Sequence, residues 1–300
     1  MAYLCQFASI VVGLSATVDA NSPMEAYGIL RAVDPAYAGT LEQFLTNYIN
    51  YYRDPMGKIR IVQRSPIKNQ SYYDYIFQRI YYSHTIEGMP NVTFVDKYCT
   101  PTPGQLLLLD AIDAQRDNPL TSSLGKIARS QIVIDYPRAV GLDEDSPKLQ
   151  LCLSIIHERP QSSFVIFSPY LEVLHWLLQI LPTYGYRTGI IDGSVSSKNR
   201  FSVSQSFNNH ELDVLLLSPA GGDSINCYCD SFIFWTLPYS GIQVRQGLGR
   251  CLRLDSPHRN ILCHFLICGS PDAKRMATIA TKQANENSTE AHAQLAFGTP

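Results

Sequence analysis

The sequence lacks features that would assign it at once to a simple class of protein. Its 8 cysteines include no Cys-x-x-Cys pair, no lysine or arginine precedes Arg31, and no apolar run approaches the length of a membrane span. A zinc ribbon, a signal peptide and a membrane anchor are therefore not expected, and no metal site is predicted. We expect an intracellular protein, nuclear, cytoplasmic or viral, with reduced cysteines.

Two further absences concern binding. The formal net charge is −2, so no global basic field predicts binding to nucleic acid, and any such contact must come from a local patch. No Gly-x-x-x-x-Gly-Lys-Ser/Thr phosphate loop occurs, and no Gly-x-Gly-x-x-Gly follows a first strand, which disfavours a dinucleotide-binding enzyme. What is present is a chain of 300 residues, 45% hydrophobic and 17% charged, which suffices for one large or two small folded domains.

Short apolar runs alternate with helical patterns in the C-terminal half. The predicted strands are 163–167, 187–191, 214–217, 231–237 and 260–267, and the predicted helices between and around them include 147–157, 171–181, 198–207 and 272–283. This alternation predicts an α/β fold with a parallel sheet and helices on both faces. Ligands of such sheets bind at the carboxyl ends of the strands, where small polar residues follow several of these runs.

One stretch of the C-terminal half carries phosphate-binding chemistry. Gln246, Arg250 and Arg253 are spaced by four and three residues, so a continuous helix would present all three on one face. Arginine stays charged, and its planar fork binds phosphate oxygens in pairs. We therefore expect a phosphate site at this helix, at the carboxyl edge of the sheet; a solvated helix face with two arginines is the alternative.

These residues also carry a resemblance. Gln-x-x-Gly-Arg-x-x-Arg at 246–253 resembles motif VI of superfamily 2 helicases and translocases, and LLLSPAGGDSIN at 215–226 resembles their motif V. The amino-acid sequence around these two motifs is most similar to that of the Snf-type, chromatin-remodelling branch. The resemblance implies a RecA-like C-terminal lobe in which Arg250 and Arg253 act as arginine fingers on ATP, Gln246 senses the nucleotide, and Gly222, Asp223 and Gly249 belong to the nucleotide site.

Shorter similarities extend the resemblance over most of the chain. Three serines, each after a predicted strand, stand at family positions that contact a nucleic-acid backbone: Ser168, Ser194 and Ser218. The family analogy implies duplex DNA as the nucleic acid. Ser15, Ala16 and Thr17 follow the apolar run 8–14 and resemble motif III, which implies coupling between two lobes.

The resemblance also implies a division of the chain. Residues 1–18 correspond to a remnant of a first RecA-like lobe, 19–140 to a mainly helical insertion region, 141–285 to the helicase C-terminal lobe, and 286–300 to a flexible tail. Within the insertion region we predict helices over 24–34, 41–52, 70–82, 100–115 and 120–132, and a strand over 91–98. Thr40 and Gln43 have the spacing of a helix capping box.

Only the second half of a Snf-type motor is represented. The phosphate loop and the Asp-Glu-Ala-Asp/His run belong to the first lobe, and phosphoryl transfer needs both lobes. ATP and Mg²⁺ are therefore expected only with a first RecA-like lobe, in cis or in a partner chain, and this chain alone is not expected to hydrolyse ATP. Ser224 stands where the family usually has glycine, so the alternative is a non-catalytic scaffold subunit in transcription, chromatin or replication, built on a degenerate lobe.

Overall fold

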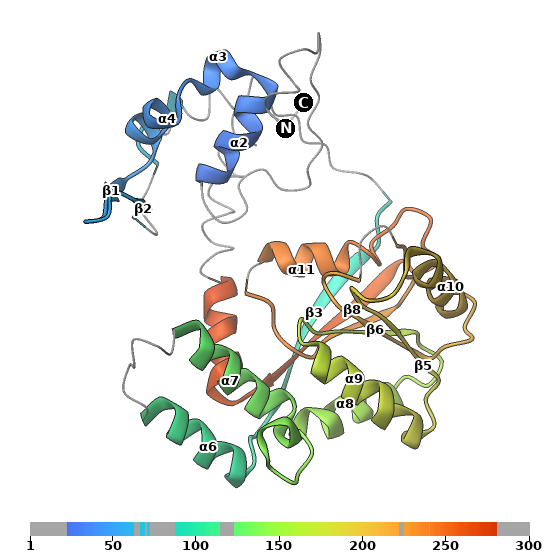
Figure 1. Cartoon of the computed structure of the whole chain (residues 1–300). Helices are drawn as coiled ribbons and strands as arrows, with labels where there is room; N and C mark the ends of the chain where they lie inside the picture. The colour runs from blue at the N-terminus through green and yellow to red at the C-terminus, as the bar shows by residue number, and fades with distance from the viewer. Residues whose placement is uncertain are drawn as a thin grey trace. The chain divides into compact units, whose positions relative to one another are not determined.

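The computed structural model describes residues 23–62, 67–69, 71–72, 88–114, 123–221, 225–239 and 241–280. The chain divides into two compact units, one comprising residues 1–85 and 284–300 and the other residues 86–283, and each is considered by itself (Figure 1). The predicted first-lobe remnant at 1–18 and the predicted tail at 286–300 lie outside the described residues. None of the helices described is long and apolar enough to cross a membrane.

The smaller unit is mainly helical in its described part. Its elements are α2 (Pro23–Val33), α3 (Pro35–Ala38), α4 (Leu41–Tyr48) and the antiparallel strands β1 (Tyr51–Arg53) and β2 (Ile59–Ile61). The predicted capping box is confirmed, because Thr40 and Gln43 exchange side-chain and backbone hydrogen bonds. The predicted helix 41–52 ends early: Ile49 is extended, and Tyr51 and Tyr52 pair with β2 as part of β1. Of the predicted helix 70–82, only 71–72 are described, and both are helical.

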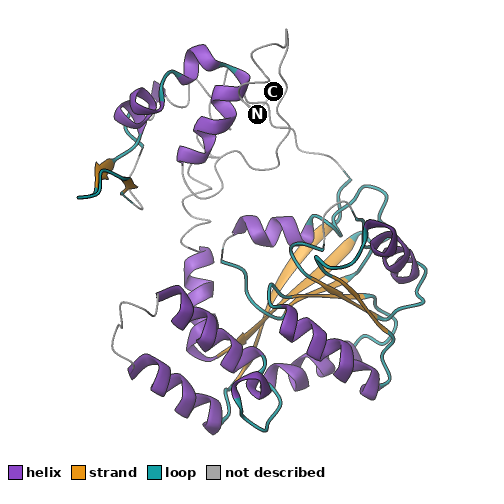
Figure 2. Cartoon of the chain, viewed as in Figure 1, coloured by secondary structure: helices purple, strands orange, loops and turns teal. Residues whose placement is uncertain are grey.

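The larger unit is built on one six-stranded sheet in which every neighbouring pair is parallel. The strand order is β3-β8-β7-β4-β6-β5. The strands are β3 (Asn91–Cys99), β4 (Phe164–Phe167), β5 (Thr188–Ile191), β6 (Val214–Leu217), β7 (Ser231–Phe234) and β8 (Asn260–Cys268). Figure 2 shows these strands at the centre of the unit with helices around them. The parallel sheet expected from the sequence is confirmed.

Helices cover both faces of this sheet, as predicted. Alternate residues of a strand enter different cores: Val165 and Phe167 pack with α10 (Ser197–Asn208) and α11 (Gly241–Leu248), whereas Phe164 and Ile166 pack with α8 (Pro147–His157) and α9 (Leu171–Ile180). The chain moves one way across the sheet from β4 to β5 and the other way from β5 to β8. Right-handed crossovers in opposite directions place their helices on opposite faces.

Strand β3 joins the sheet over its full length. All nine of its residues pair with β8, and it is followed by α6 (Pro103–Ala114) and α7 (Ser123–Asp135). These elements fall in the range 19–140 that the sequence analysis assigned to the insertion region, yet they belong to the larger unit. The difference arises because β3 pairs with a strand about 170 residues later, a contact that no local pattern indicates. Residues 269–280 form a helix after β8.

Candidate functional site

Small polar residues gather at the carboxyl edge of the sheet, as the topology predicts. Ser168 directly follows β4, Asp192 follows β5 and Ser218 follows β6. Because β4, β5 and β6 are parallel and adjacent, these residues leave the sheet at the same edge. Hydrogen bonds between the ends of the strands hold this edge together, since Ser168 N donates to Leu217 O and Ser218 N to Ile191 O.

The turn after β5 is fixed around a buried carboxylate. Both the backbone N and the Oγ of Ser194 donate to Asp192 Oδ1, at 2.8 and 2.6 Å, and His175 Nε2 lies 3.0 Å from Asp192 Oδ2. Burial opposes ionisation of Asp192, but the hydrogen bonds from His175 and Ser194 outweigh it and lower its pKa to about 2. Ser194 itself is exposed, so its hydroxyl is presented on a turn that cannot easily move.

Two further contacts hold the same turn from outside. Arg200 on α10 donates from Nε to Val195 O at 2.7 Å and from Nη2 to Gly193 O at 3.2 Å. On the other side the backbone of Gly221 lies so close that a Cβ there would meet Ile191 O at 2.2 Å. Glycine is therefore required at 221, where the loop after β6 packs directly against the end of β5.

Two of the three predicted nucleic-acid serines are buried within the lobe, and their contact with nucleic acid stays a prediction. Ser168 is fully buried: its Oγ lies 2.8 Å from Thr236 Oγ1 and accepts from Tyr170 N at 3.2 Å. Ser218 is 2% exposed and its Oγ accepts from Gly221 N. A hydroxyl at the end of a buried strand is nearer to the turn's own donors than to solvent, so it satisfies those donors instead. Ser194 is exposed, although its hydroxyl is bonded to Asp192.

The predicted common helix face of Gln246, Arg250 and Arg253 is wrong. Helix α11 ends at Leu248, and both arginines lie in the turn and loop beyond it. Beyond the helix, Arg250 O accepts the backbone N of Cys227 at 3.0 Å, which ties this loop to the segment that leads into β7. Gln246 is exposed, and Arg250 and Arg253 are half-buried.

The location of these residues also differs from the prediction. Helix α11 begins after β7 but runs back over the sheet, so the position of Gly247 lies against the rings of Phe232 and Phe234. Cys227, which binds the backbone of Arg250, belongs to the segment that leads into β7. The helix that carries Gln246 therefore lies over β7, and the loop with Arg250 lies beside the segment that leads into β7.

The remaining predicted site residues divide between described and undescribed segments. Gly249 follows α11, and its backbone N donates to Arg245 O at 2.7 Å. Gly222 and Asp223 lie outside the described residues, as do Ser15, Ala16 and Thr17. The roles assigned to all of these residues stay predictions. Within the described segments, no group of three or more His, Cys, Asp or Glu residues is arranged to hold a metal ion.

A buried polar network that the sequence did not predict lies behind the carboxyl edge. Lys148 Nζ lies 2.7 Å from Asp135 Oδ1, from Asp272 Oδ2 and from Trp235 O, and Lys148 and both aspartates are fully buried. Burial alone would lower the pKa of Lys148, but the two carboxylates outweigh it and raise that pKa. Gln131 Nε2 donates to both carboxylates. In the sequence, the one indication of this network was a lysine among the apolar residues of α8.

This network reaches the end of β4. Thr236 Oγ1 donates to Asp135 Oδ2 at 2.6 Å and lies 2.8 Å from Ser168 Oγ. Cys268 N donates to Asp272 Oδ2 at 2.8 Å, which ties the end of β8 into the same set of contacts. The ends of β4, β7 and β8 are therefore joined through buried side chains, and the edge behaves as one rigid surface.

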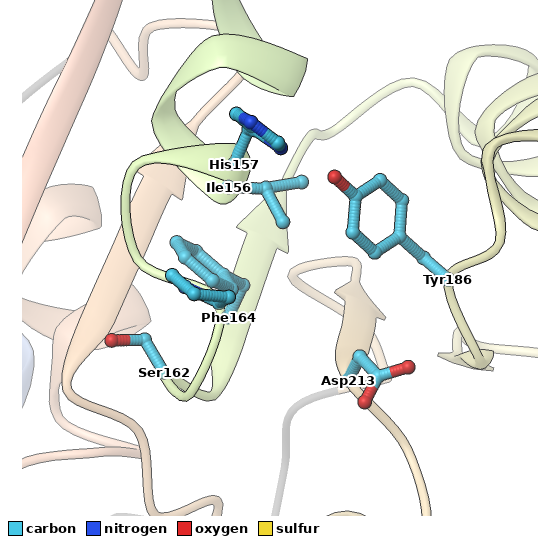
Figure 3. A pocket seen from close by; sticks show the side chains of 7 residues that line it. Ile156, His157, Ser162, Phe164, Tyr186 and Asp213 are labelled. Carbon is cyan, nitrogen blue, oxygen red and sulfur yellow. The ribbon is translucent and has the colours of Figure 1, made fainter.

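A pocket of about 260 Å³ lies elsewhere on the sheet (Figure 3). Phe164 and Asp213, which line it, mark the amino-terminal ends of β4 and β6, so the pocket is at the edge opposite Ser168 and Ser218. The hydroxyl of Tyr186 points toward Ile156 in Figure 3. Asp213 is already bound by Arg187 through Nη2 and Nε. The pocket is separate from the polar residues described above.

Comparison with known proteins identifies the family of the lobe. Residues 147–255 match the helicase conserved C-terminal domain. The chain is 25% identical over 228 residues to an uncharacterized ATP-dependent helicase of Mycoplasma pneumoniae, covering 72% of this chain and 21% of that protein. It is 32% identical over 169 residues to the DNA repair and recombination protein RAD54B of Homo sapiens, covering 54% of this chain and 19% of that protein.

A solved structure supports the same assignment of fold. The Sulfolobus solfataricus SWI2/SNF2 ATPase core in complex with dsDNA has a TM-score of 0.56 to this chain at 17% identity, covering 90% of this chain and 60% of that one. The chain spans about a fifth of the length of the two curated relatives described above. The chain is therefore similar to the C-terminal half of Snf-type ATPases of superfamily 2, and its larger unit is a RecA-like lobe that carries the match to the helicase conserved C-terminal domain.

Proposed function

We propose that this chain supplies the C-terminal lobe of an ATP-dependent translocase that acts on nucleic acid, with duplex DNA as the substrate. The observation that carries the proposal is the pair of half-buried arginines beyond α11, anchored through the bond from Cys227 N to Arg250 O. This bond fixes the backbone from which the Arg250 side chain starts, so only the side chain has to be ordered when it meets a phosphate. The proposal that the substrate is duplex DNA is supported by the similar SWI2/SNF2 ATPase core, whose structure was solved in complex with dsDNA.

In this proposal Arg250 and Arg253 neutralise charge on the phosphates of ATP, and the exposed Gln246 hydrogen-bonds the nucleotide. Gly222, Asp223 and Gly249 complete this side of the nucleotide site. A first RecA-like lobe, in cis or in a partner chain, supplies the phosphate loop and the ligands of Mg²⁺, which neutralises phosphate charge when bound. Ser15, Ala16 and Thr17 couple the two lobes.

The nucleic-acid surface in this proposal is the carboxyl edge, with Ser194 as the contact residue. Its turn is exposed and is held by Asp192 and Arg200. In this structure Ser194 Oγ donates its proton to Asp192 Oδ1, so in this proposal the hydroxyl turns from that carboxylate to a backbone phosphate when nucleic acid binds. Ser168 and Ser218 act indirectly by keeping the neighbouring loops in place.

The deciding experiment measures ATP hydrolysis by the native protein or complex that contains this sequence, with and without duplex DNA. We expect DNA-stimulated hydrolysis that Arg250→Ala reduces by about 10³-fold or more, since arginine fingers contribute that much. Arg187→Ala is the matched control, because Arg187 is bound to Asp213 at the opposite edge of the sheet. Equal hydrolysis by wild type and Arg250→Ala would refute the assigned role.

A non-catalytic scaffold is the second candidate. It is favoured by one observation: the hydroxyls of Ser168 and Ser218 are used inside the lobe and not offered to a ligand. A scaffold would bind its partner protein without hydrolysing ATP in any complex. Wild-type levels of partner binding by Arg250→Ala, together with no ATP hydrolysis by the wild-type complex, would favour this reading over the motor.

A further inference from the structure

The segment between β7 and α11, residues 235–239, is held by two buried cations; we call it the connector. Lys148 Nζ donates to Trp235 O at 2.7 Å, and Arg275 Nη1 donates to Leu237 O at 2.6 Å. Lys148 is fully buried and Arg275 is 3% exposed. Bonds from charged donors are stronger than neutral ones, so two alternate carbonyls of the connector are fixed in place.

The second terminal nitrogen of Arg275 joins the connector to the loop after β4. Arg275 Nη2 donates to Tyr239 OH at 2.6 Å and to Tyr170 OH at 3.0 Å. The guanidinium carbon also lies 4.0 Å from the centre of the Tyr239 ring. Burial, the largest influence, raises the pKa of Tyr170 to about 12, so its hydroxyl stays neutral beside the guanidinium. One planar group thus binds three partners on two loops.

The connector sets the start of α11. The backbone N of Tyr239 donates to Gln243 Oε1 at 2.7 Å, a contact between the connector and the first turn of the helix. Helix α11 carries Gln246 and leads to Arg250, whose carbonyl is bound by Cys227 N. The helix is therefore held at both ends, by Arg275 through the connector and by Cys227.

We propose that Arg275 is a positioning residue that fixes the orientation of α11 and so the placement of Gln246 and Arg250. This role rests on the proposed function, because those two residues meet ATP only there. Arg275 itself touches no ligand. Lysine cannot replace it fully, since a single ammonium group lacks the planar fork that reaches Leu237 O and both tyrosines at once.

The test is hydrogen–deuterium exchange of the full chain, read by mass spectrometry in peptides that cover residues 241–249. Arg275→Met should speed exchange in these peptides by about tenfold or more, because it removes several hydrogen bonds that hold the start of the helix. Lys274→Met is the matched control: Lys274 is the preceding residue of the same helix and is exposed, so exchange at 241–249 should not change.

Two further variants separate positioning from general stabilisation. Tyr239→Phe keeps the ring but loses the hydroxyl bound by Arg275, and should give a smaller increase confined to the same peptides. Arg275→Lys should lie between wild type and Arg275→Met. Unchanged exchange at 241–249 in Arg275→Met would overturn the proposal. A uniform increase across β4, β6 and α11, with Arg275→Lys no better than Arg275→Met, would also overturn it by showing a purely structural role.

The exchange experiment needs no nucleotide, so it can fail or succeed independently of ATP hydrolysis. If the native complex hydrolyses ATP, Arg275→Lys should lower kcat while the affinity for duplex DNA stays at the wild-type value. If the complex hydrolyses no ATP but exchange at 241–249 responds as expected, Arg275 positions α11 and the motor function fails. The two proposals therefore stand or fall on separate results.

Discussion

Lys148 Nζ lies 2.7 Å from Asp272 Oδ2, and both side chains are fully buried in the larger unit. Lys148 also forms an ion pair with Asp135, which is fully buried as well. Replacing it with methionine keeps most of its length but leaves two buried carboxylates uncompensated. We expect Lys148→Met to lower the free energy of unfolding by about 3–5 kcal/mol, measured by urea denaturation.

Lys274→Met is the control for that experiment, because Lys274 is exposed on the helix that carries Asp272. Its free energy of unfolding should stay within about 0.5 kcal/mol of wild type. Equal stability of Lys148→Met and wild type would contradict the view that the lysine compensates the two carboxylates.

Asp192 should make stability depend on pH in a defined window. Its pKa is lowered from 3.8 to about 2, so the folded state favours the ionised form. The resulting stability is fully present above pH 4 and is lost as the pH falls from about 4 toward 2. Because His175 is largely exposed, solvent weakens this effect, and we expect Asp192→Asn to cost about 1 kcal/mol at pH 7.

The difference between wild type and Asp192→Asn should shrink as urea denaturation is repeated from pH 5 down to pH 3. A difference that stayed constant over this range would mean that the amide substitution acts by altered packing and not by loss of charge. Glu172→Gln is a suitable control, since it removes a carboxylate from the same helix as His175.

Gly221 cannot accept a side chain without moving the end of β5. A Cβ at this position would lie 2.2 Å from Ile191 O, which is backbone and cannot rotate away. Gly221→Ala should therefore lower the melting temperature and cost about 1–3 kcal/mol of stability, as overpacked sites do.

Gly247→Ala is the matched change at a site with room, where the nearest atoms of Phe234 would be 3.5 Å from the new methyl group. Alanine also suits the interior of α11 better than glycine, so this variant should be as stable as wild type or slightly more so. Similar losses in both variants would argue against the close approach of Gly221 to β5.

Ser194 and Ser168 should respond differently to alanine. Ser194→Ala removes an exposed hydroxyl and should weaken binding of duplex DNA by the native protein about twofold to tenfold, and the lost bond to Asp192 should cost about 0.5–1.5 kcal/mol of stability. Ser168→Ala leaves the part-buried Tyr170 N without its acceptor and should cost about 1–2 kcal/mol of stability with DNA affinity unchanged. Fluorescence anisotropy and urea denaturation measure the two effects. The reverse pattern would mean that Ser168 reaches the nucleic acid.

Local patterns predicted most of the elements that form the lobe. The strand Val214–Leu217 and the helix Pro147–His157 were predicted at their observed bounds, because an apolar run of four residues and a Ser-Pro helix start are encoded by adjacent residues. The parallel sheet followed from their alternation, and with it the edge at which Ser168 and Ser218 lie. The resemblance of residues 215–226 and 246–253 then pointed to the family.

The contacts that local patterns did not predict have a common physical origin. The loop beyond α11 is held by Cys227, more than twenty residues earlier, whose backbone N donates to Arg250 O. Strand β3 joins the sheet because β8 is available to it. Spacing along the chain describes neither contact, since both partners are distant in sequence and meet only after the sheet has formed.

The sequence by itself determined the succession of most strands and helices along the larger unit, the parallel nature of the sheet and the resemblance to a family. The first two depend on periodicity, and the resemblance depends on short motifs. Only the tertiary structure decided which polar groups are offered to a ligand. It buried Ser168 against Thr236, left Ser194 exposed, and enclosed Lys148 with two carboxylates. Whether a polar side chain faces solvent or the interior depends on the free energy of its hydrogen bonds to distant residues, and only folding brings those residues together.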